Sequence, residues 1–484
     1  MFKLSKTNYV LSILAIFTLS FTNAQTFSYG TSLWSEPYNE DGTKISKGDY
    51  YFFGLDEELY TLSEIKNPPN SKLKVRCITK DLKIKWEYLH TYGEKQVVEL
   101  QEVLNDREKN TVTFFISSWW FGKKSASLIG IVVDRTTGKE LSKKVLFQDK
   151  ESNYYVQKSN NQKYVVINRN TKPDKNKDGN ARMVIDSELN VLTNTSVMLP
   201  KKYYPLHTTI SDNGNLIVVL HSPSEKNLKI NVYEEDLLIY TIDGAKEMLN
   251  RSYVDFQLRL KNDNLYIACM IGAKEGECQG FDVYRFNIID KKTYSAAGNL
   301  IDKTRIQKWF SEVPEKSVHW AEAPRKGPGK FKKFRIEDVS VDENGSVYIS
   351  AGKLKTDTDA EGNTESHLED GLITKFEADG TQSWTTILLR FNYGSLSAFR
   401  TYYNPKSKSI EMVSSDFTEK SNNLVYRRIN PENGNIIKYE RFPKHCRNAH
   451  DGGWLWTPDY MMLGVEKLYK GNKRSSPLML KMEF

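Results

Sequence analysis

Three segments of the chain repeat one pattern and decide the fold class. They read TISDNGNLIVVLH at Thr209–His221, VSVDENGSVYISA at Val339–Ala351 and LRLKNDNLYIAC at Leu258–Cys269. In each, an alternating run enters a tight turn of Asn, Asp or Gly and leaves through β-branched and aromatic residues. That composition is typical of an antiparallel β-hairpin. Hairpins that resemble one another along a chain indicate a repeat architecture.

Fainter copies of this hairpin bring the number to eight. Their turns centre near positions 56, 107, 161, 213, 263, 343, 406 and 459, mostly 50 to 55 residues apart. The gaps of about 80 residues after 263 and about 63 after 343 indicate insertions. We place the first at about residues 302–335 and the second, an acidic loop, at about residues 356–370.

A second hairpin pattern lies between successive copies. Examples are IVVDRTTGKEL at Ile131–Leu141, ITKFEADGTQSW at Ile373–Trp384 and YRRINPENGNIIKY at Tyr426–Tyr439. Two hairpins make a four-stranded unit, and small sheets that bury their faces against one another form a ring. The sequence therefore predicts a single all-β domain at residues 25–484, a β-propeller of about eight four-stranded blades, with seven as the alternative. A strand within Thr26–Leu33 would complete the last blade and close the ring.

Two of the turns carry a resemblance to a known group of propellers. Val133–Lys139 reads VDRTTGK, which resembles the Asp-x-x-Thr-Gly turn of propellers with pyrroloquinoline-quinone-like repeats, and Glu377–Trp384 resembles their turn with a following tryptophan. The NHL-type repeats are similar. The resemblance implies a fold and no activity. Quinone dehydrogenases of that group place two adjacent cysteines beside the cofactor, and this sequence has no Cys-Cys pair, so no quinone is expected.

The first 24 residues have the pattern of a secretion signal. Lys3 and Lys6 precede an apolar run from Val10 to Phe21, and Thr22–Ala24 has the small residues of a cleavage site. The run is shorter than the roughly 20 residues of a membrane-spanning helix. We therefore expect an exported protein, periplasmic or extracellular, with no transmembrane segment. Without the two leader lysines the net charge falls from +8 to about +6, which does not favour nucleic acid as a partner.

Calcium is the cofactor that the sequence suggests, at two loops with alternating oxygen ligands. The first holds Asp174, Asn176 and Asp178, followed by a glycine, but Ile185 stands where an EF-hand has its closing carboxylate. The second holds Asp357, Asp359 and Glu361. Solvated turns between strands are the alternative for both loops.

The four cysteines of an exported chain permit disulfides. Cys269 and Cys278 flank turn-prone residues, and a bridge between them is one prediction. Cys77 and Cys446 lie far apart in the chain and would meet if the ring closes. Free buried thiols are the alternative for either pair.

The first insertion combines positive charge with aromatic residues. A short amphipathic helix is expected at Lys303–Phe310. Cations near aromatic rings can bind an anionic polymer or a glycan, and a solvated connector is the alternative. The candidate ligand-binding residues are Trp309, His319, Trp320, Lys330, Lys332, Lys333 and Arg335.

Aromatic and histidine side chains outside the insertions offer weaker signals. Trp119, Trp120, Trp454 and Trp456 would form either stacking platforms for a sugar or packing between blades. His207 and His450 each precede an inner hairpin, near the expected axial opening. No nucleophile elbow, phosphate loop or zinc motif accompanies them.

Three functions are compatible with these patterns. The leading hypothesis is a non-catalytic exported propeller that binds a protein or a glycan, because no local catalytic motif is present. The first alternative is a carbohydrate- or polymer-active enzyme, since residues from several blades can assemble an active site without a local motif. The second is an assembly or structural factor of the cell envelope. Paired carboxylates in the axial funnel would favour the enzyme, whereas an aromatic-lined funnel would favour binding.

Overall fold

The structure is a computed structural model that describes most of the chain after residue 26. The described residues are 27–29, 51–55, 58–65, 70–93, 96–120, 123–149, 153–170, 180–196, 202–222, 224, 227–235, 237–243, 251–272, 278–298, 300, 334–358, 364–392, 400–418, 421–442, 446–468 and 475–484. The predicted secretion signal lies outside these residues and stays a prediction. Within the described residues, no helix is long and apolar enough to cross a membrane.

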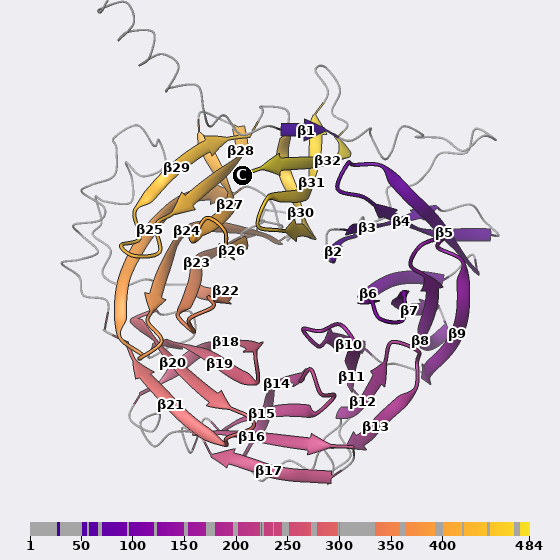
Figure 1. The fold of residues 1–484 in the computed structure, drawn as a ribbon, viewed down its shortest axis with the longest axis horizontal. Helices are drawn as coiled ribbons and strands as arrows, with labels where there is room; N and C mark the ends of the chain where they lie inside the picture. Colours follow the sequence, from indigo (N-terminus) through magenta and orange to yellow (C-terminus); the bar gives the residue numbers. More distant parts are fainter. Residues whose placement is uncertain are drawn as a thin grey trace, which may run out of the picture.

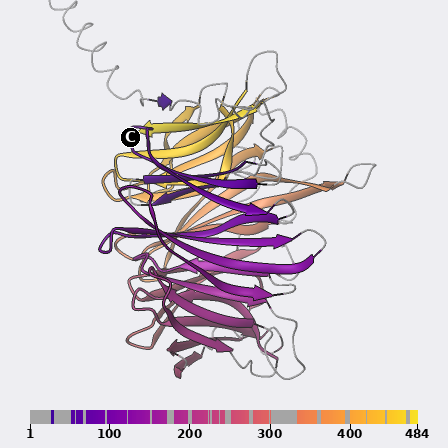
Figure 2. The same cartoon turned by 90° about the vertical axis from the view of Figure 1, so that its right-hand side faces the viewer.

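Eight four-stranded antiparallel sheets form a closed ring around a central axis (Figure 1). Figure 2 shows this ring edge-on, with the strands running between its two faces. The predicted β-propeller fold and the blade number of eight are therefore confirmed, and the seven-bladed alternative is wrong.

The first four blades follow one another in chain order, each from its innermost to its outermost strand. They consist of β2 (Tyr51–Leu55), β3 (Glu58–Ile65), β4 (Asn70–Ile78) and β5 (Ile84–Gly93); β6 (Gln96–Asp106), β7 (Thr111–Trp120), β8 (Lys123–Asp134) and β9 (Glu140–Asp149); β10 (Asn153–Lys158), β11 (Tyr164–Asn170), β12 (Asn180–Asp186) and β13 (Val191–Ser196); and β14 (Tyr204–Ile210), β15 (Leu216–Ser222), β16 (Asn227–Glu234) and β17 (Leu237–Asp243).

The last four blades continue in the same way. They consist of β18 (Tyr253–Lys261), β19 (Asn264–Ile271), β20 (Gly280–Asn287) and β21 (Lys292–Ala297); β22 (Phe334–Val341), β23 (Val347–Thr358), β24 (Thr364–Phe376) and β25 (Gln382–Asn392); β26 (Arg400–Asn404), β27 (Ser409–Thr418), β28 (Ser421–Ile429) and β29 (Ile436–Arg441); and β30 (Cys446–Trp456), β31 (Tyr460–Leu468), β32 (Ser475–Glu483) and β1 (Phe27–Tyr29).

The eight hairpins predicted from the repeat are the eight pairs of innermost strands, from β2–β3 to β30–β31. Gly214 and Gly345 occupy their turns with φ of 87°, a left-handed conformation that glycine adopts without a steric penalty. The second hairpin pattern is also confirmed, because it forms β8–β9, β24–β25 and β28–β29.

An N-terminal strand closes the ring, as the sequence predicted. β1 pairs antiparallel with β32, with Phe27 opposite Met482 and Tyr29 opposite Leu480. It is the outermost strand of the eighth blade and lies near the C-terminus in Figure 2. The closing strand spans Phe27–Tyr29 within the predicted Thr26–Leu33.

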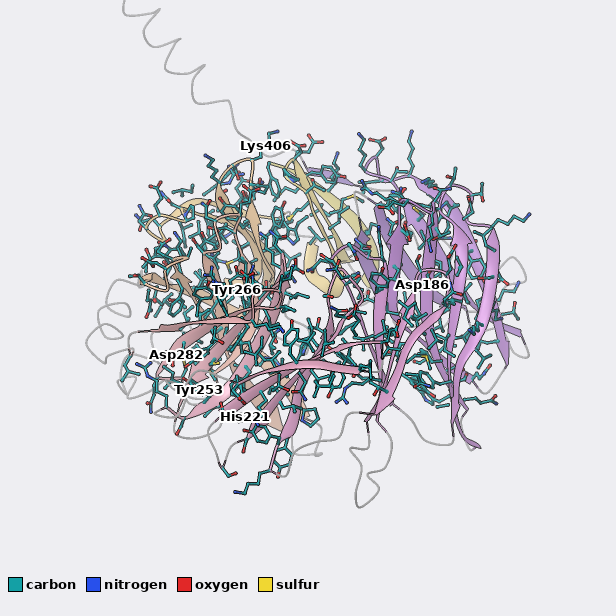
Figure 3. All side chains as sticks on the ribbon, turned by 60° about the horizontal axis from the view of Figure 1, so that its bottom comes forward. Asp186, His221, Tyr253, Tyr266, Asp282 and Lys406 are labelled. Carbon is teal, nitrogen blue, oxygen red and sulfur yellow. The ribbon has the colours of Figure 1, made fainter. Side chains whose placement is uncertain are left out.

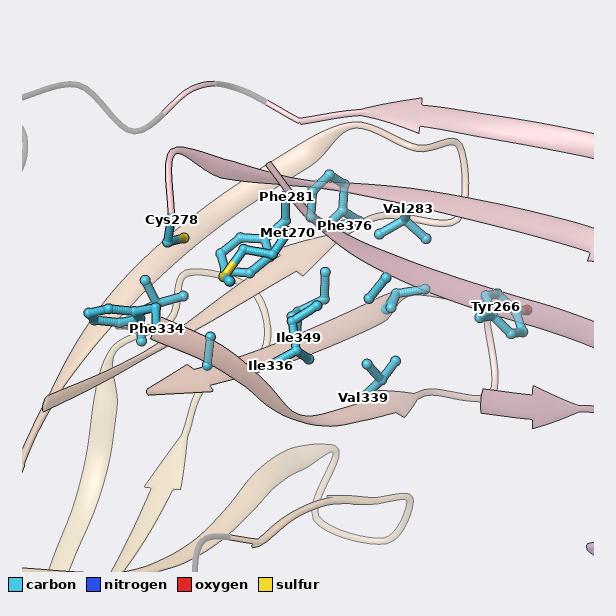
Figure 4. Packing of buried hydrophobic residues seen from close by; sticks show 14 of the residues in the cluster. Tyr266, Met270, Cys278, Phe281, Val283, Phe334, Ile336, Val339, Ile349 and Phe376 are labelled. Atoms are coloured by element: carbon cyan, nitrogen blue, oxygen red, sulfur yellow. The ribbon is translucent and has the colours of Figure 1, made fainter. Parts of the chain in front are cut away.

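Neighbouring blades pack through apolar side chains on their facing sides. Figure 4 shows one such layer, where Met270 and Phe281 of the fifth blade contact the side of the sixth blade that carries Ile349. Met270 and Ile349 are fully buried. Because successive strand residues point to opposite faces, the near-continuous apolar runs in the middle strands fill both interfaces of a blade.

A β-bulge near the start of an outermost strand recurs in several blades and directs one aromatic side chain toward the next blade. Trp86 in β5 donates a hydrogen bond from Nε1 to the carbonyl of Arg135 at 2.8 Å, and Trp384 in β25 donates to the carbonyl of Pro431 at 2.9 Å. Both carbonyls belong to the turn between the two outer strands of the following blade. The bulge adds one residue to the strand and turns the side chain that follows it. The hydrogen bond from this tryptophan to the next blade is called the lock between blades below.

The second insertion differs from the prediction. Residues 356–370 are mostly strand, because β23 and β24 extend as a hairpin in which Asp357 pairs with Glu365 and Thr358 with Thr364. Residues 359–363 lie outside the described part of the chain. β-Branched residues along both strands, such as Thr356 and Thr364, favour the extended conformation. Residues 301–333, with the predicted helix, also lie outside it.

Candidate functional site

The innermost strands surround the axis, and four of them contain a β-bulge followed by a polar residue. The bulges precede Glu102 in β6, His207 in β14, Asp255 in β18 and Asp338 in β22. A bulge bends its strand and turns the following side chain. All four residues lie on innermost strands, which surround the axial opening in Figure 1.

Two of the three carboxylates tie their blade to the backbone of the next one. Asp255 accepts a hydrogen bond from the backbone N–H of Ile336 at 2.6 Å. Asp338 accepts one from the backbone N–H of Thr401 at 3.3 Å and one from the hydroxyl of the same residue at 2.8 Å. Burial raises the pKa of Asp255, and the N–H groups of Ile336 and Phe256 oppose that rise. These oxygens serve as acceptors in the joints between blades.

Glu102 makes a comparable joint through an ion pair. Its Oε1 lies 3.0 Å from Nζ of Lys158 in β10 of the next blade. The same lysine also donates to the carbonyl of Val103 at 3.4 Å. The ion pair of Glu102 therefore holds β10 in place, and β10 carries part of the candidate site described next.

The candidate site is an axial cluster of Tyr155 and Gln157 from β10 and His207 from β14, and Tyr204 lies at the start of β14. Tyr155 and Gln157 are two residues apart and share one face of their strand. The amide nitrogen of Gln157 donates to the hydroxyl of Tyr155 at 3.0 Å and lies 3.3 Å from Nε2 of His207. The cluster therefore links the innermost strands of two neighbouring blades.

The axial cluster combines exposed aromatic rings with polar groups that carry no charge. The side chains of Tyr155 and Tyr204 are 56% and 63% exposed, although both lie on innermost strands. Burial lowers the pKa of His207 to about 4, so its imidazole is neutral at neutral pH. The Gln157 Oε1 atom is buried with no hydrogen-bond partner in the described chain. The arrangement presents the Tyr155 ring, held by a neutral amide–imidazole pair, and the exposed ring of Tyr204 on the next innermost strand.

A second polar cluster lies in the fifth blade, where Figure 3 shows Tyr253 and Asp282 close together. The buried Asp282 accepts hydrogen bonds from Arg251 and from the Tyr253 hydroxyl, both at 2.7 Å, and from the backbone N–H of Gly298 at 2.8 Å. Burial raises its pKa, and these donors oppose the rise. Arg251 and Tyr253 lie at the beginning of the blade and Gly298 lies at its end, so their hydrogen bonds to Asp282 hold the two ends of the blade together. We call this cluster a structural clamp.

Glycine is required at position 298 of this clamp. A Cβ atom there would lie 1.9 Å from the backbone oxygen of Phe281.

The predicted Cys269–Cys278 disulfide is not formed, and both residues are free buried thiols. Cys269 packs into the interface with the fourth blade, beside Ile267 and Ile230. Cys278 packs into the interface with the sixth blade, on the side seen in Figure 4. The two side chains therefore project from opposite faces of one sheet, a separation that sequence spacing does not reveal. Burial raises the pKa of Cys278 to about 12.

Cys77 is also a free buried thiol, which removes the suggested pairing with Cys446.

Most residues of the predicted insertion site and of the calcium loops fall outside the described part of the chain. Arg335 is described, lies in β22 and is exposed. Asp357 lies on β23, where its backbone pairs with Glu365. The described residues contain no group of three or more His, Cys, Asp or Glu side chains that could hold a metal. The undescribed ones are Trp309, His319, Trp320, Lys330, Lys332, Lys333, Asp174, Asn176, Asp178, Asp359 and Glu361.

The aromatic residues from the sequence divide between packing and exposure. Trp456 stacks on Tyr402 and Phe484, with ring centroids 5.6 and 6.1 Å apart, so it packs between blades. Trp119 is 39% exposed at the end of β7. Sequence reasoning placed His207 near the axis but missed Tyr155 and Gln157, whose alternation on β10 is the one signal that could have found them.

No protein-family model and no curated protein matches this chain. Solved structures do resemble it. A polysaccharide lyase matches with a TM-score of 0.40 and 10% identity over 96% of this chain and 98% of that chain. A quinohemoprotein alcohol dehydrogenase from Pseudomonas putida HK5 matches with a TM-score of 0.43 and 10% identity over 91% of this chain and 75% of that chain.

A third similar structure is the β-propeller domain of a protease from Pyrococcus furiosus. It matches with a TM-score of 0.39 and 9% identity over 85% of this chain and 98% of that domain. At such identities the likeness concerns the fold alone, because propellers host unrelated activities.

Proposed function

We propose that the protein is an exported binding propeller and that its axial cluster binds a neutral glycan. The observation that carries this proposal is the pair of exposed tyrosines, Tyr155 and Tyr204, on innermost strands of neighbouring blades. A sugar ring offers an apolar face of C–H groups, which stacks on an aromatic side chain, and a rim of hydroxyls, which seek hydrogen bonds.

Hydrogen bonds fix the side chain of Tyr155 in place before a ligand binds. Its hydroxyl is bonded to Gln157, and Gln157 is in turn placed against His207. Fixing a side chain before the ligand arrives lowers the entropy cost of binding. Because the imidazole is neutral and Gln157 carries no charge, the cluster favours an uncharged ligand over an anionic polymer.

The carboxylates near the axis support binding over acid–base chemistry. Asp255 and Asp338 accept hydrogen bonds from the next blade, and Glu102 is paired with Lys158. A general acid or base must reach the reacting group of a substrate, and these oxygens are committed to joints between blades.

The proposal is tested by calorimetric titration of the mature protein with a panel of neutral and acidic oligosaccharides. We expect a neutral oligosaccharide to bind, and Tyr155→Ala and Tyr204→Ala each to weaken its binding about tenfold, the loss of one stacking contact. Tyr294→Ala is the matched control, because Tyr294 is 44% exposed but lies on the outermost strand β21. Binding of acidic sugars alone, or equal binding by all three variants, would contradict the proposal.

A further inference from the structure

The outermost strand of the fourth blade, β17, exposes an unusual apolar edge. Leu237, Leu238 and Ile239 are 71%, 50% and 42% exposed. β17 lies at the end of its sheet, and within the described chain it pairs with β16 alone. One side of β17 therefore presents backbone N–H and C=O groups that no described strand covers.

Other outermost strands interrupt their apolar residues with charge. β9 carries Lys143 and Lys144 in its middle, and β29 carries Lys438 and Glu440. Charged residues on an edge strand prevent another strand from pairing with it. From Leu237 to Ile242, β17 reads LLIYTI and contains no charged residue, so β17 lacks this protection. The outermost strand β13 (Val191–Ser196) is also uncharged, but it reads VLTNTS and is polar after its first two residues.

Acidic side chains flank the uncharged run at both ends. Glu234 and Glu235 are exposed just before it. Asp243 follows it, 70% exposed, and lies 3.6 Å from Lys229. Two copies of β17 paired edge to edge would bring acidic ends together in either direction, and like charges at close range repel. The charge pattern therefore disfavours a second copy of this chain as the occupant.

We infer that the β17 edge, defined by Glu234, Glu235 and residues 237–243, binds an extended apolar segment of a protein partner that carries basic residues on both sides of its apolar core. The segment adds a strand to the fourth blade. Its backbone bonds to β17, its apolar side chains contact Leu237, Leu238 and Ile239, and its basic residues face the acidic ends. Strand addition of this kind obtains affinity from the backbone and specificity from side chains and charge. This surface is separate from the axial cluster, since β17 is the outermost strand and β14 the innermost one.

The test uses the mature protein and a fluorescent synthetic peptide of about eight residues, with alternating valine and threonine in the middle and two lysines at each end. A peptide with glutamate in place of every lysine is its control. By fluorescence anisotropy, we expect the lysine-flanked peptide to bind at least tenfold more tightly. The preference should shrink as salt is raised, because exposed charges are screened.

Two variants locate the binding at β17. Leu238→Lys places a charge in the apolar run and should weaken binding of the lysine-flanked peptide at least tenfold. Leu141→Lys is the matched control, because Leu141 is 55% exposed at the bulge of β9, and it should leave binding unchanged. The double variant Glu234→Lys with Glu235→Lys should shift the preference toward the glutamate-flanked peptide. Leu238 is half exposed, so its replacement leaves the fold intact.

Three outcomes would overturn the inference. Equal affinity for the two peptides would show that the acidic ends of β17 do not select the partner. An equal loss of affinity for the lysine-flanked peptide in Leu238→Lys and Leu141→Lys would show that the peptide does not bind at β17. A dimer in analytical ultracentrifugation that Leu238→Lys dissolves would make a second copy the occupant. None of these results concerns glycan binding, so the two proposals fail separately.

Discussion

The lock between the sixth and seventh blades gives a quantitative prediction for Gly434→Ala. Gly434 has φ of 75°, and a Cβ there would lie 2.5 Å from the Trp384 ring and 2.5 Å from Oγ1 of Thr386. The left-handed conformation costs an alanine about 1–2 kcal/mol. Relief of the contact must displace the indole, whose hydrogen bond to the Pro431 carbonyl is worth about 1–3 kcal/mol when a buried partner is left unpaired.

The free energy of unfolding should therefore fall by about 2–5 kcal/mol in Gly434→Ala. Gly345→Ala is the matched control, because Gly345 has φ of 87° and its Cβ would meet no atom nearer than 3.5 Å. That variant should lose only the backbone cost, about 1–2 kcal/mol. The measurement is urea unfolding followed by tryptophan fluorescence. Thermal unfolding is less suitable, because for a chain of this length a change of 1 kcal/mol moves the Tm by only roughly 1 °C.

A double-variant cycle decides whether the indole is the cause. In the Trp384→Ala background the ring is absent, so Gly434→Ala should cost about 1–3 kcal/mol less than it does alone. The remaining cost comes from the backbone and from Thr386. If Gly434→Ala were no more damaging than Gly345→Ala, or if its cost were unchanged without Trp384, the lock would contribute nothing to stability.

Two further predictions concern single side chains. Because burial lowers the pKa of His207 to about 4 from 6.5, the folded state binds its proton less readily than the unfolded state. The free energy of unfolding is therefore unaffected by His207 above about pH 6.5 and falls as the pH drops toward 4. In urea unfolding at about pH 5, His207→Gln should lose about 1–2 kcal/mol less of this free energy than the parent protein does. The thiols of Cys269 and Cys278 should resist alkylation in the folded protein and react after unfolding. A disulfide-linked peptide of the two in a non-reducing digest would contradict the structure.

The repeat could be predicted because each hairpin is encoded locally. Turn sequences such as DNGN at Asp212–Asn215 specify the left-handed glycine that the turn needs, and the flanking alternation specifies the strands. Eight such units at a regular spacing imply a ring. The extension of β23 and β24 was missed because acidic residues in an alternating stretch also fit a loop.

The axial cluster could not be predicted in full, because the ring creates it. Gln157 and His207 meet across two blades, and the bulge before His207 orients its ring. Neither event leaves a local motif. The misplaced disulfide has a related cause, since whether two cysteines share a sheet face depends on bulges and loop paths that spacing does not encode.

The pairing of β1 with β32 also sets the order in which the chain can mature. The first described strand pairs with the last described strand, so a chain emerging from a ribosome or crossing a membrane holds seven blades before the eighth can close. During that interval the faces of the first and last blades that will later meet are open to water and to other chains. Pairing between distant segments is slow, and such surfaces attract aggregation. Ring closure is therefore the step at which a folding assistant would matter most.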